Sequence, residues 1–262
     1  MLLQEIEKAI RDGVLNFAVV GCNRSGTGVI QAMLQTFPGV VCHQNLFHPD
    51  TKIRKKCYMS YFSDKNYFKY NETNPTQFLS HQIFDHRKYN EKCVGVRITY
   101  DVMLHLDLFD YFNYRYLEGD FCLIHVIRNP IACYVSELQA QATGRYCLLT
   151  TENYHNKKPT PVLVDIDHLV SYIKKYESAI GKVDNCCHDR INIKYYDILF
   201  NFQNVVRRIV HFLELPDILT PVRCPFQRLP NWPMRYRIAN YGFVEKYIPS
   251  GFKHYLTDPE FV

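Results

Sequence analysis

Residues 21 to 28, Gly-Cys-Asn-Arg-Ser-Gly-Thr-Gly, combine glycine, hydroxyl and guanidinium groups between two apolar stretches. The run FAVVG precedes and partly overlaps them, and apolar residues with helical spacing follow. A strand that ends in a glycine-containing loop and opens a helix presents backbone N–H groups and the positive end of the helix dipole to an anion. The loop is therefore predicted to bind a phosphate group.

The loop differs from that of nucleotide triphosphatases, G-x-x-x-x-G-K-[ST], in which the lysine reaches the terminal phosphates and a hydroxyl holds magnesium. Gly21 and Gly26 have the right spacing, but Thr27 follows where the lysine would stand, and Arg24 is the loop's only cation. The later run FCLIHVI is followed by Arg128 rather than by a metal-binding aspartate. Because the magnesium-dependent apparatus lacks two parts, no metal is expected here.

A second anion site is predicted after that later run. The stretch RNPIACYVS places Arg128 at the carboxyl end of a strand and Ser136 eight residues on, in the following helix. Ligands of open α/β sheets gather at the carboxyl ends of strands, so a guanidinium and a hydroxyl there suit an anion beside the first. Two phosphate sites without a metal indicate a nucleotide that is phosphorylated at two places.

Short, continuous apolar runs alternate with helical patterns along the chain, as in a sheet buried on both faces. The expected strands are 17–21, 39–43, 93–98, 121–127 and 191–196. Helices are expected between the first two strands, from the N1-type Pro130, and over about 202–215. The pattern predicts an α/β fold with a largely parallel sheet and helices on both faces.

The 262 residues are expected to form one domain over 1–262, because the chain is 47% hydrophobic and 22% charged. The segments 48–92 and 140–185 are less regular, with room for short helices, and are the expected variable, acceptor-side surface. A formal charge of +5 with dispersed Lys and Arg argues against nucleic acid as a partner and suits an anionic small ligand.

The first sixteen residues do not resemble a signal peptide, and no apolar run approaches the roughly 20 residues that span a bilayer. Cys42, Cys93 and Cys122 lie inside strand-like runs, which favours buried, reduced thiols. The sequence therefore predicts a soluble, cytoplasmic protein without an integral membrane segment.

The two loop motifs together resemble those of the sulfotransferase family. RSGT at 24–27 resembles the [KR]-[ST]-G-[ST] loop that binds the 5′-phosphosulfate of 3′-phosphoadenosine 5′-phosphosulfate (PAPS), and RNPIACYVS resembles the R-[ND]-P-x5-S element that binds its 3′-phosphate. CVGVRITYDVM, IKYYDILFNFQNVVRRIVHFLELP and RIANYGFVEKYIPSGFKHYL add similarity to the bacterial carbohydrate sulfotransferases over about half the chain. The resemblance implies a P-loop-like, three-layer αβα fold with a mostly parallel central sheet.

The resemblance also implies roles for individual residues. The residues implied to cradle the 5′-phosphate are Ser25, Gly26, Thr27 and Gly28. Arg24 would lie over the bridging oxygen, where charge appears as the S–O bond breaks. Arg128 and Ser136 would bind the 3′-phosphate, and Tyr195 would contact the adenine, although in a chain with 20 tyrosines it could equally belong to the core.

The general base has no direct counterpart, because Asn45 stands where many bacterial relatives have a glutamate, and an amide cannot accept the proton. His43 and His48 flank the gap, and imidazole has a suitable pKa. His48, in the loop, is the preferred candidate over His43, which ends a strand. Arg97 matches the basic residue of the central strand and is a candidate contact for the transferring sulfonate.

The sequence thus predicts an enzyme that moves a sulfonate from PAPS to the hydroxyl of a small-molecule or glycan acceptor, on a carbohydrate or glycolipid by family analogy. One alternative is a nucleotide kinase or triphosphatase with a degenerate loop. The other is a non-catalytic nucleotide-binding module, which Asn45 keeps open.

Overall fold

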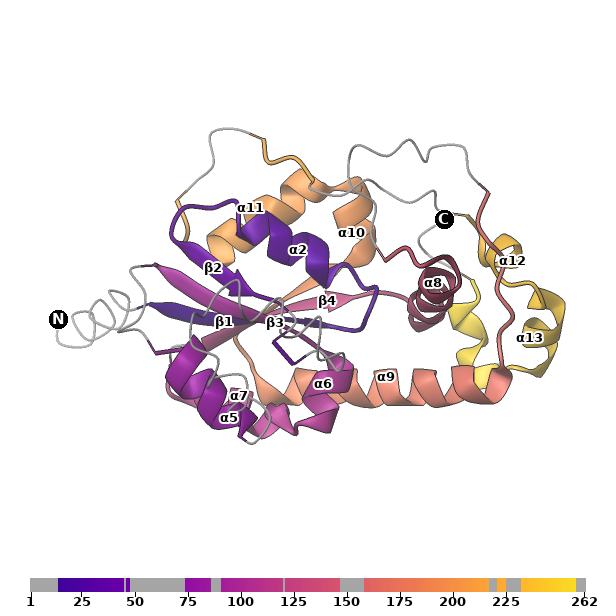
Figure 1. The fold of residues 1–262 in the computed structure, drawn as a ribbon, viewed down its shortest axis with the longest axis horizontal. Helices are drawn as coiled ribbons and strands as arrows, with labels where there is room; N and C mark the ends of the chain where they lie inside the picture. Colours follow the sequence, from indigo (N-terminus) through magenta and orange to yellow (C-terminus); the bar gives the residue numbers. More distant parts are fainter. Residues whose placement is uncertain are drawn as a thin grey trace.

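The computed structural model describes residues 14–44, 46–47, 74–85, 91–119, 121–146, 158–216, 221–224 and 232–257. Its centre is a five-stranded sheet in the order β2-β3-β1-β4-β5 (Figure 1). The strands are β1 (Leu15–Gly21), β2 (Val40–His43), β3 (Cys93–Thr99), β4 (Phe121–Ile127) and β5 (Arg190–Lys194). All neighbouring strands pair in parallel, which confirms the predicted α/β fold with a parallel sheet.

Helices cover both faces of the sheet, because the central strands are apolar on both sides (Figure 1). One face packs against α2 (Thr27–Leu34), α10 (Tyr195–Phe200) and α11 (Phe202–Phe212). The other packs against α5 (Pro75–Phe78), the π-helical turn η1 (Leu79–Ile83), α6 (Tyr100–His105), α7 (Leu108–Leu117) and α9 (Ile166–Cys186). The predicted three-layer arrangement is confirmed.

A third apolar cluster lies beyond the carboxyl end of β4, where α8 (Pro130–Thr143) meets α12 (Met234–Arg237), α13 (Tyr241–Tyr247) and the 3₁₀ turn η3 (Ser250–Tyr255) (Figure 1). Pro130 is the first residue of α8, as predicted. Asn129 caps the helix: its side chain accepts from the Ala132 N–H at 3.1 Å and donates to the Tyr255 carbonyl at 2.8 Å. The cap ties the end of β4 to the C-terminal helices.

Two elements end earlier than the sequence predicted. The strand expected over 191–196 ends at Lys194, which pairs with Ile127, the last residue of β4. The chain turns into α10 there, because the edge strand has no further ladder partner. The helix expected over 202–215 ends at Phe212, and the left-handed Glu214 (φ 50°) reverses the chain.

The expectation of an irregular 140–185 segment was wrong for its second half, which forms the 21-residue helix α9. Its buried positions recur about once per turn, at Leu169, Ile173, Tyr176, Ala179 and Val183, while the rest of its surface is largely polar. A narrow apolar stripe in a polar helix gives a weak pattern. Packing against α7, α8 and the apolar clusters on that side of the sheet stabilises the helix.

Among the helices that the structure describes, none is both long and apolar enough to cross a membrane. Cys42, Cys93 and Cys122 are buried free thiols in the sheet, and burial raises the pKa of each above its usual value.

Candidate functional site

The loop after β1 folds tightly around its own hydroxyl group. Ser25 is fully buried, and its Oγ donates to the Cys22 carbonyl at 2.8 Å. Arg24 (φ 68°) and Gly26 (φ 98°) both have left-handed backbone conformations, and Gly26 is the N-cap of α2. The first N–H groups of a helix have no intrahelical partner, so this turn presents donors where an anion can accept them.

Glycine is needed at position 26 of the loop, and the space beside Gly28 is narrow. A Cβ on Gly26 would lie 2.9 Å from Tyr195 Cδ2, in a backbone conformation that side chains rarely adopt. A Cβ on Gly28 would lie 3.0 Å from Arg97 Nη1, so the Arg97 guanidinium lies against the first turn of α2. The close approach of Tyr195 and Arg97 to the backbone places both side chains at the loop.

Arg128, directly after β4, lies beside the same loop. Its side chain is buried, and Nη1 donates to the Arg24 carbonyl at 2.7 Å. The guanidinium also lies over the Tyr195 ring, with Cζ 3.9 Å from the centroid. The two strand ends that the sequence singled out are therefore joined directly, through the backbone of one arginine and the side chain of the other.

Arg24 reaches α8 and the segment that follows it. Its Nε donates to Ser136 Oγ at 3.3 Å, and Nη1 donates to the Tyr146 carbonyl. Burial lowers the pKa of the Arg24 guanidinium. The charge of Glu137 raises that pKa in part, and the charge of Arg128 lowers it further. Because two partly desolvated cations repel each other, a bound anion would lower the free energy of the site.

The structure thus brings together the residues predicted to bind the cofactor: Arg24, Ser25, Gly26, Thr27, Gly28, Arg128, Ser136 and Tyr195. Arg97 of β3, which the sequence indicated as a candidate contact for the transferring sulfonate, lies at the same loop. Sequence reasoning missed Tyr146, because a backbone carbonyl can come from any residue type.

Of the candidates for the general base, only His43 lies among the described residues. It ends β2 and is 2% exposed, and burial lowers the pKa of its imidazole to about 4. A buried ring with so low a pKa is a weak base. The preferred candidate His48 and the neighbouring Asn45 lie outside the described residues.

A polar cluster that the sequence did not indicate borders the loop. Asn23 Nδ2 donates to Asp101 Oδ2 at 3.4 Å, and Lys175 Nζ lies 2.6 Å from Asp101 Oδ1. Thr99 pairs with Gly21 across the strands, so the start of α6 reaches the loop directly. Within the described ranges, no three His, Cys, Asp or Glu side chains are grouped to hold a metal ion.

Comparison with solved structures finds sulfotransferases. The chain is similar to the sulfotransferase from Alicyclobacillus acidocaldarius at 14% identity, over 91% of this chain and 98% of that one, with a TM-score of 0.47. It is similar to the sulfotransferase domain of the Synechococcus PCC 7002 olefin synthase at 11% identity, over 94% and 93%, with a TM-score of 0.49. A mouse sulfotransferase complexed with PAP matches at 10% identity, over 94% and 84%, with a TM-score of 0.41. No protein-family model and no curated protein matches the chain.

Proposed function

We propose that this protein is a sulfotransferase that binds PAPS between the ends of β1 and β4 and transfers its sulfonate to an acceptor hydroxyl. The observation that carries the proposal is the junction of Arg24 and Arg128. The Arg128 guanidinium contacts the Arg24 backbone while the Arg24 side chain turns to Ser136. Two guanidinium groups beside one helix N-terminus suit a ligand with phosphate at two positions.

Each part of the site has a task in this reaction. The backbone N–H groups at Gly26, Thr27 and Gly28 hold the 5′-phosphate, and Ser25 keeps the loop in shape through its bond to Cys22. Arg128 binds the 3′-phosphate, a group that ATP lacks. Arg24 stabilises the charge that develops on the leaving phosphate oxygen.

The transfer is a single in-line displacement. The acceptor oxygen forms a bond to sulfur as the bond from sulfur to the 5′-phosphate oxygen breaks, which leaves 3′-phosphoadenosine 5′-phosphate (PAP). The acceptor's proton passes to a general base, for which we retain His48. The buried His43, with its pKa lowered to about 4, is the weaker alternative. The proposed acceptor is a hydroxyl on a carbohydrate or glycolipid.

The buried free thiols fit a reducing compartment, and we propose a cytoplasmic location. A kinase or triphosphatase reading is less favoured, because Thr27 stands where those enzymes need a lysine and Arg128 has no task with ATP. A non-catalytic module would bind PAPS and transfer nothing.

Ligand-induced stabilisation separates these functions. We expect PAP without magnesium to raise the melting temperature more than magnesium-ATP does, since a ligand stabilises according to its affinity for the folded state. Equal or larger stabilisation by magnesium-ATP would overturn the proposal in favour of a kinase. Binding of PAPS without transfer to any acceptor in a broad hydroxyl panel would favour the module.

A further inference from the structure

The backbone of Arg128 is hydrogen-bonded to a tyrosine of α9, the helix that packs on the face of the sheet away from α2. Arg128 is the first residue after β4, and the ladder to β5 ends one residue earlier, at Ile127. Its N–H donates to Tyr176 Oη at 3.3 Å, and the same hydroxyl donates to the Arg128 carbonyl. Tyr176 lies on α9, 48 residues along the chain.

A phenol suits this position because one hydroxyl both accepts and donates. Arg128 is 8% exposed and Tyr176 is 4% exposed, so water has little access to either backbone group. Burial raises the pKa of the Tyr176 hydroxyl well above its usual value, and the proton needed for the bond to the Arg128 carbonyl stays in place. Tyr176 therefore pairs both backbone polar groups of Arg128 beyond the end of the strand ladder.

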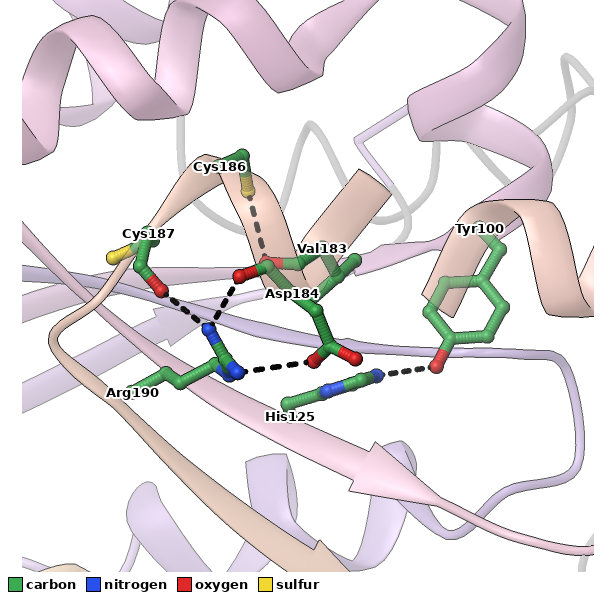
Figure 2. A network of polar contacts seen from close by, with 7 residues as sticks. All are labelled: Tyr100, His125, Val183, Asp184, Cys186, Cys187 and Arg190. Carbon is green, nitrogen blue, oxygen red and sulfur yellow. Dashed lines mark hydrogen bonds and ion pairs between the residues drawn. The ribbon is translucent and has the colours of Figure 1, made fainter. Parts of the chain in front are cut away.

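The ring of Tyr176 is itself supported. Tyr100 packs edge to face against it, with centroids 5.5 Å apart. The Tyr100 hydroxyl bonds to Nε2 of the fully buried His125, in the same network as the Asp184–Arg190 ion pair (Figure 2). A side chain whose neighbours are packed and hydrogen-bonded holds its partner in one position.

The Tyr176 hydroxyl contacts the backbone of Arg128, whereas the Arg128 side chain has a different task. The Arg128 guanidinium extends to the Arg24 carbonyl and the Tyr195 ring. We infer that Tyr176 is a positioning residue that aims the Arg128 guanidinium at the ligand's 3′-phosphate and thereby sets the preference for a 3′-phosphorylated nucleotide. The inference rests on the proposed function, since it concerns the same site.

The test compares two ligands on one variant. Calorimetric titration of wild type and Tyr176→Phe with PAP and with adenosine 5′-monophosphate gives a ratio of affinities, and that ratio isolates the 3′-phosphate. We expect Tyr176→Phe to bind PAP about tenfold more weakly and the monophosphate equally well, so the ratio falls about tenfold. A merely structural role would lower both affinities together.

Tyr111→Phe is the matched control. Tyr111 is a partly buried tyrosine of α7 and loses one hydroxyl contact, but that contact, at 3.0 Å, is with Ser80 Oγ and not with Arg128 or Tyr176. We expect its ratio to match that of the wild type. An unchanged ratio in Tyr176→Phe, or an equal fall in both variants, would overturn the inference.

A double-mutant cycle supplies an independent measurement. In the Arg128→Ala background, Tyr176→Phe should leave the ratio unchanged, because the guanidinium that it aims is absent. A further tenfold fall there would overturn the inference. If Tyr176→Phe is too unstable in buffer, the titrations are repeated for all variants in trimethylamine N-oxide, which favours the folded state.

Failure of the proposed function would be visible separately. A wild type that binds the monophosphate as tightly as PAP has no 3′-phosphate site, and this result contradicts the proposed function before any variant is examined. A wild type that prefers PAP, with a Tyr176→Phe variant that keeps the preference, contradicts only the role of Tyr176.

Discussion

The ends of β1 and β4 each bring an arginine to the same site, but they are built in different ways. The end of β1 is local: Ser25 bonds to Cys22, and the left-handed Gly26 opens α2 within a few residues. The end of β4 is assembled from distant elements, with Tyr176 of α9 on the Arg128 backbone and Tyr195 of α10 beneath its guanidinium.

The difference separates two tasks. A loop held by its own backbone has few ways to rearrange, which suits a group that must present N–H donors along a fixed direction. A junction assembled from both layers depends on the packing of the whole domain. We expect the first to govern the rate of transfer and the second to govern the choice of nucleotide.

The largest expected effect concerns Arg24, in the loop at the end of β1. Arg24→Ala should lower kcat by about 10²–10³-fold and PAP affinity by much less, because the charge that it meets develops in the transition state. The measurement is PAP release from PAPS with a panel of hydroxyl acceptors. Arg115→Ala, which removes a cation paired with Glu118 on α7, serves as the control. An equal loss in affinity and rate would show that the two arginines share one task.

Acid should lower the stability of the whole fold, including the strand that ends at Arg128, without a mutation. Burial lowers the pKa of His125, in β4, to about 4, and that of His43 likewise. Unfolded histidine takes up its proton near pH 6.5, so between pH 6.5 and 4 the unfolded state binds protons that the native state does not. Native stability is therefore complete above pH 6.5 and falls as the pH drops through this window.

For each histidine the loss approaches about 3 kcal/mol at pH 4. Urea unfolding at half-unit pH steps measures the slope. His125→Gln should lower the slope of the unfolding free energy against pH by the contribution of one proton. His43→Gln should lower it by a similar amount. A wild-type stability that stays flat from pH 6.5 to 4 would contradict the assignment of both rings as buried and neutral.

Removal of Arg128 should affect nucleotide choice alone. Arg128→Ala should weaken PAP binding by about 1.5–3 kcal/mol, the value of a hydrogen bond to a charged group, and leave adenosine 5′-monophosphate binding unchanged. Titration calorimetry with both ligands measures this. If PAP affinity does not change, the 3′-phosphate site lies elsewhere and the division between the two strand ends fails.

The same contrast explains what the sequence could predict. The loop at 21–28 and the step from Arg128 to Ser136 are visible because local features carry them: glycine where the turn requires it, proline at N1, and hydroxyls at fixed offsets. The apolar runs likewise indicated the sheet, because strands buried on both faces are continuous in sequence.

The assembled contacts were not predictable in this way. Tyr176 and Tyr195 are two of 20 tyrosines, and residue type alone does not separate a clamp or a cation–π partner from a core ring. The Tyr146 carbonyl lies 122 residues from Arg24, and no residue type marks it. In α9, Leu169, Ile173 and Tyr176 follow the spacing of a helix. They are few among polar residues, so the apolar periodicity of the segment is weak.

The smallest expected effect tests Tyr195, whose ring lies beneath the Arg128 guanidinium and beside Gly26. Tyr195→Leu removes the π face and should weaken PAP binding by about 1 kcal/mol, or about fivefold, the usual range for a cation–π contact that is partly shielded from water. Tyr195→Phe keeps the ring and should bind PAP as the wild type does.

The same two variants titrated with adenosine 5′-monophosphate separate this role from adenine contact. If Tyr195 acts through Arg128, only PAP binding weakens in Tyr195→Leu. If the ring instead contacts the adenine, both nucleotides lose affinity together, and Tyr195 then belongs to base recognition rather than to the assembled end of β4.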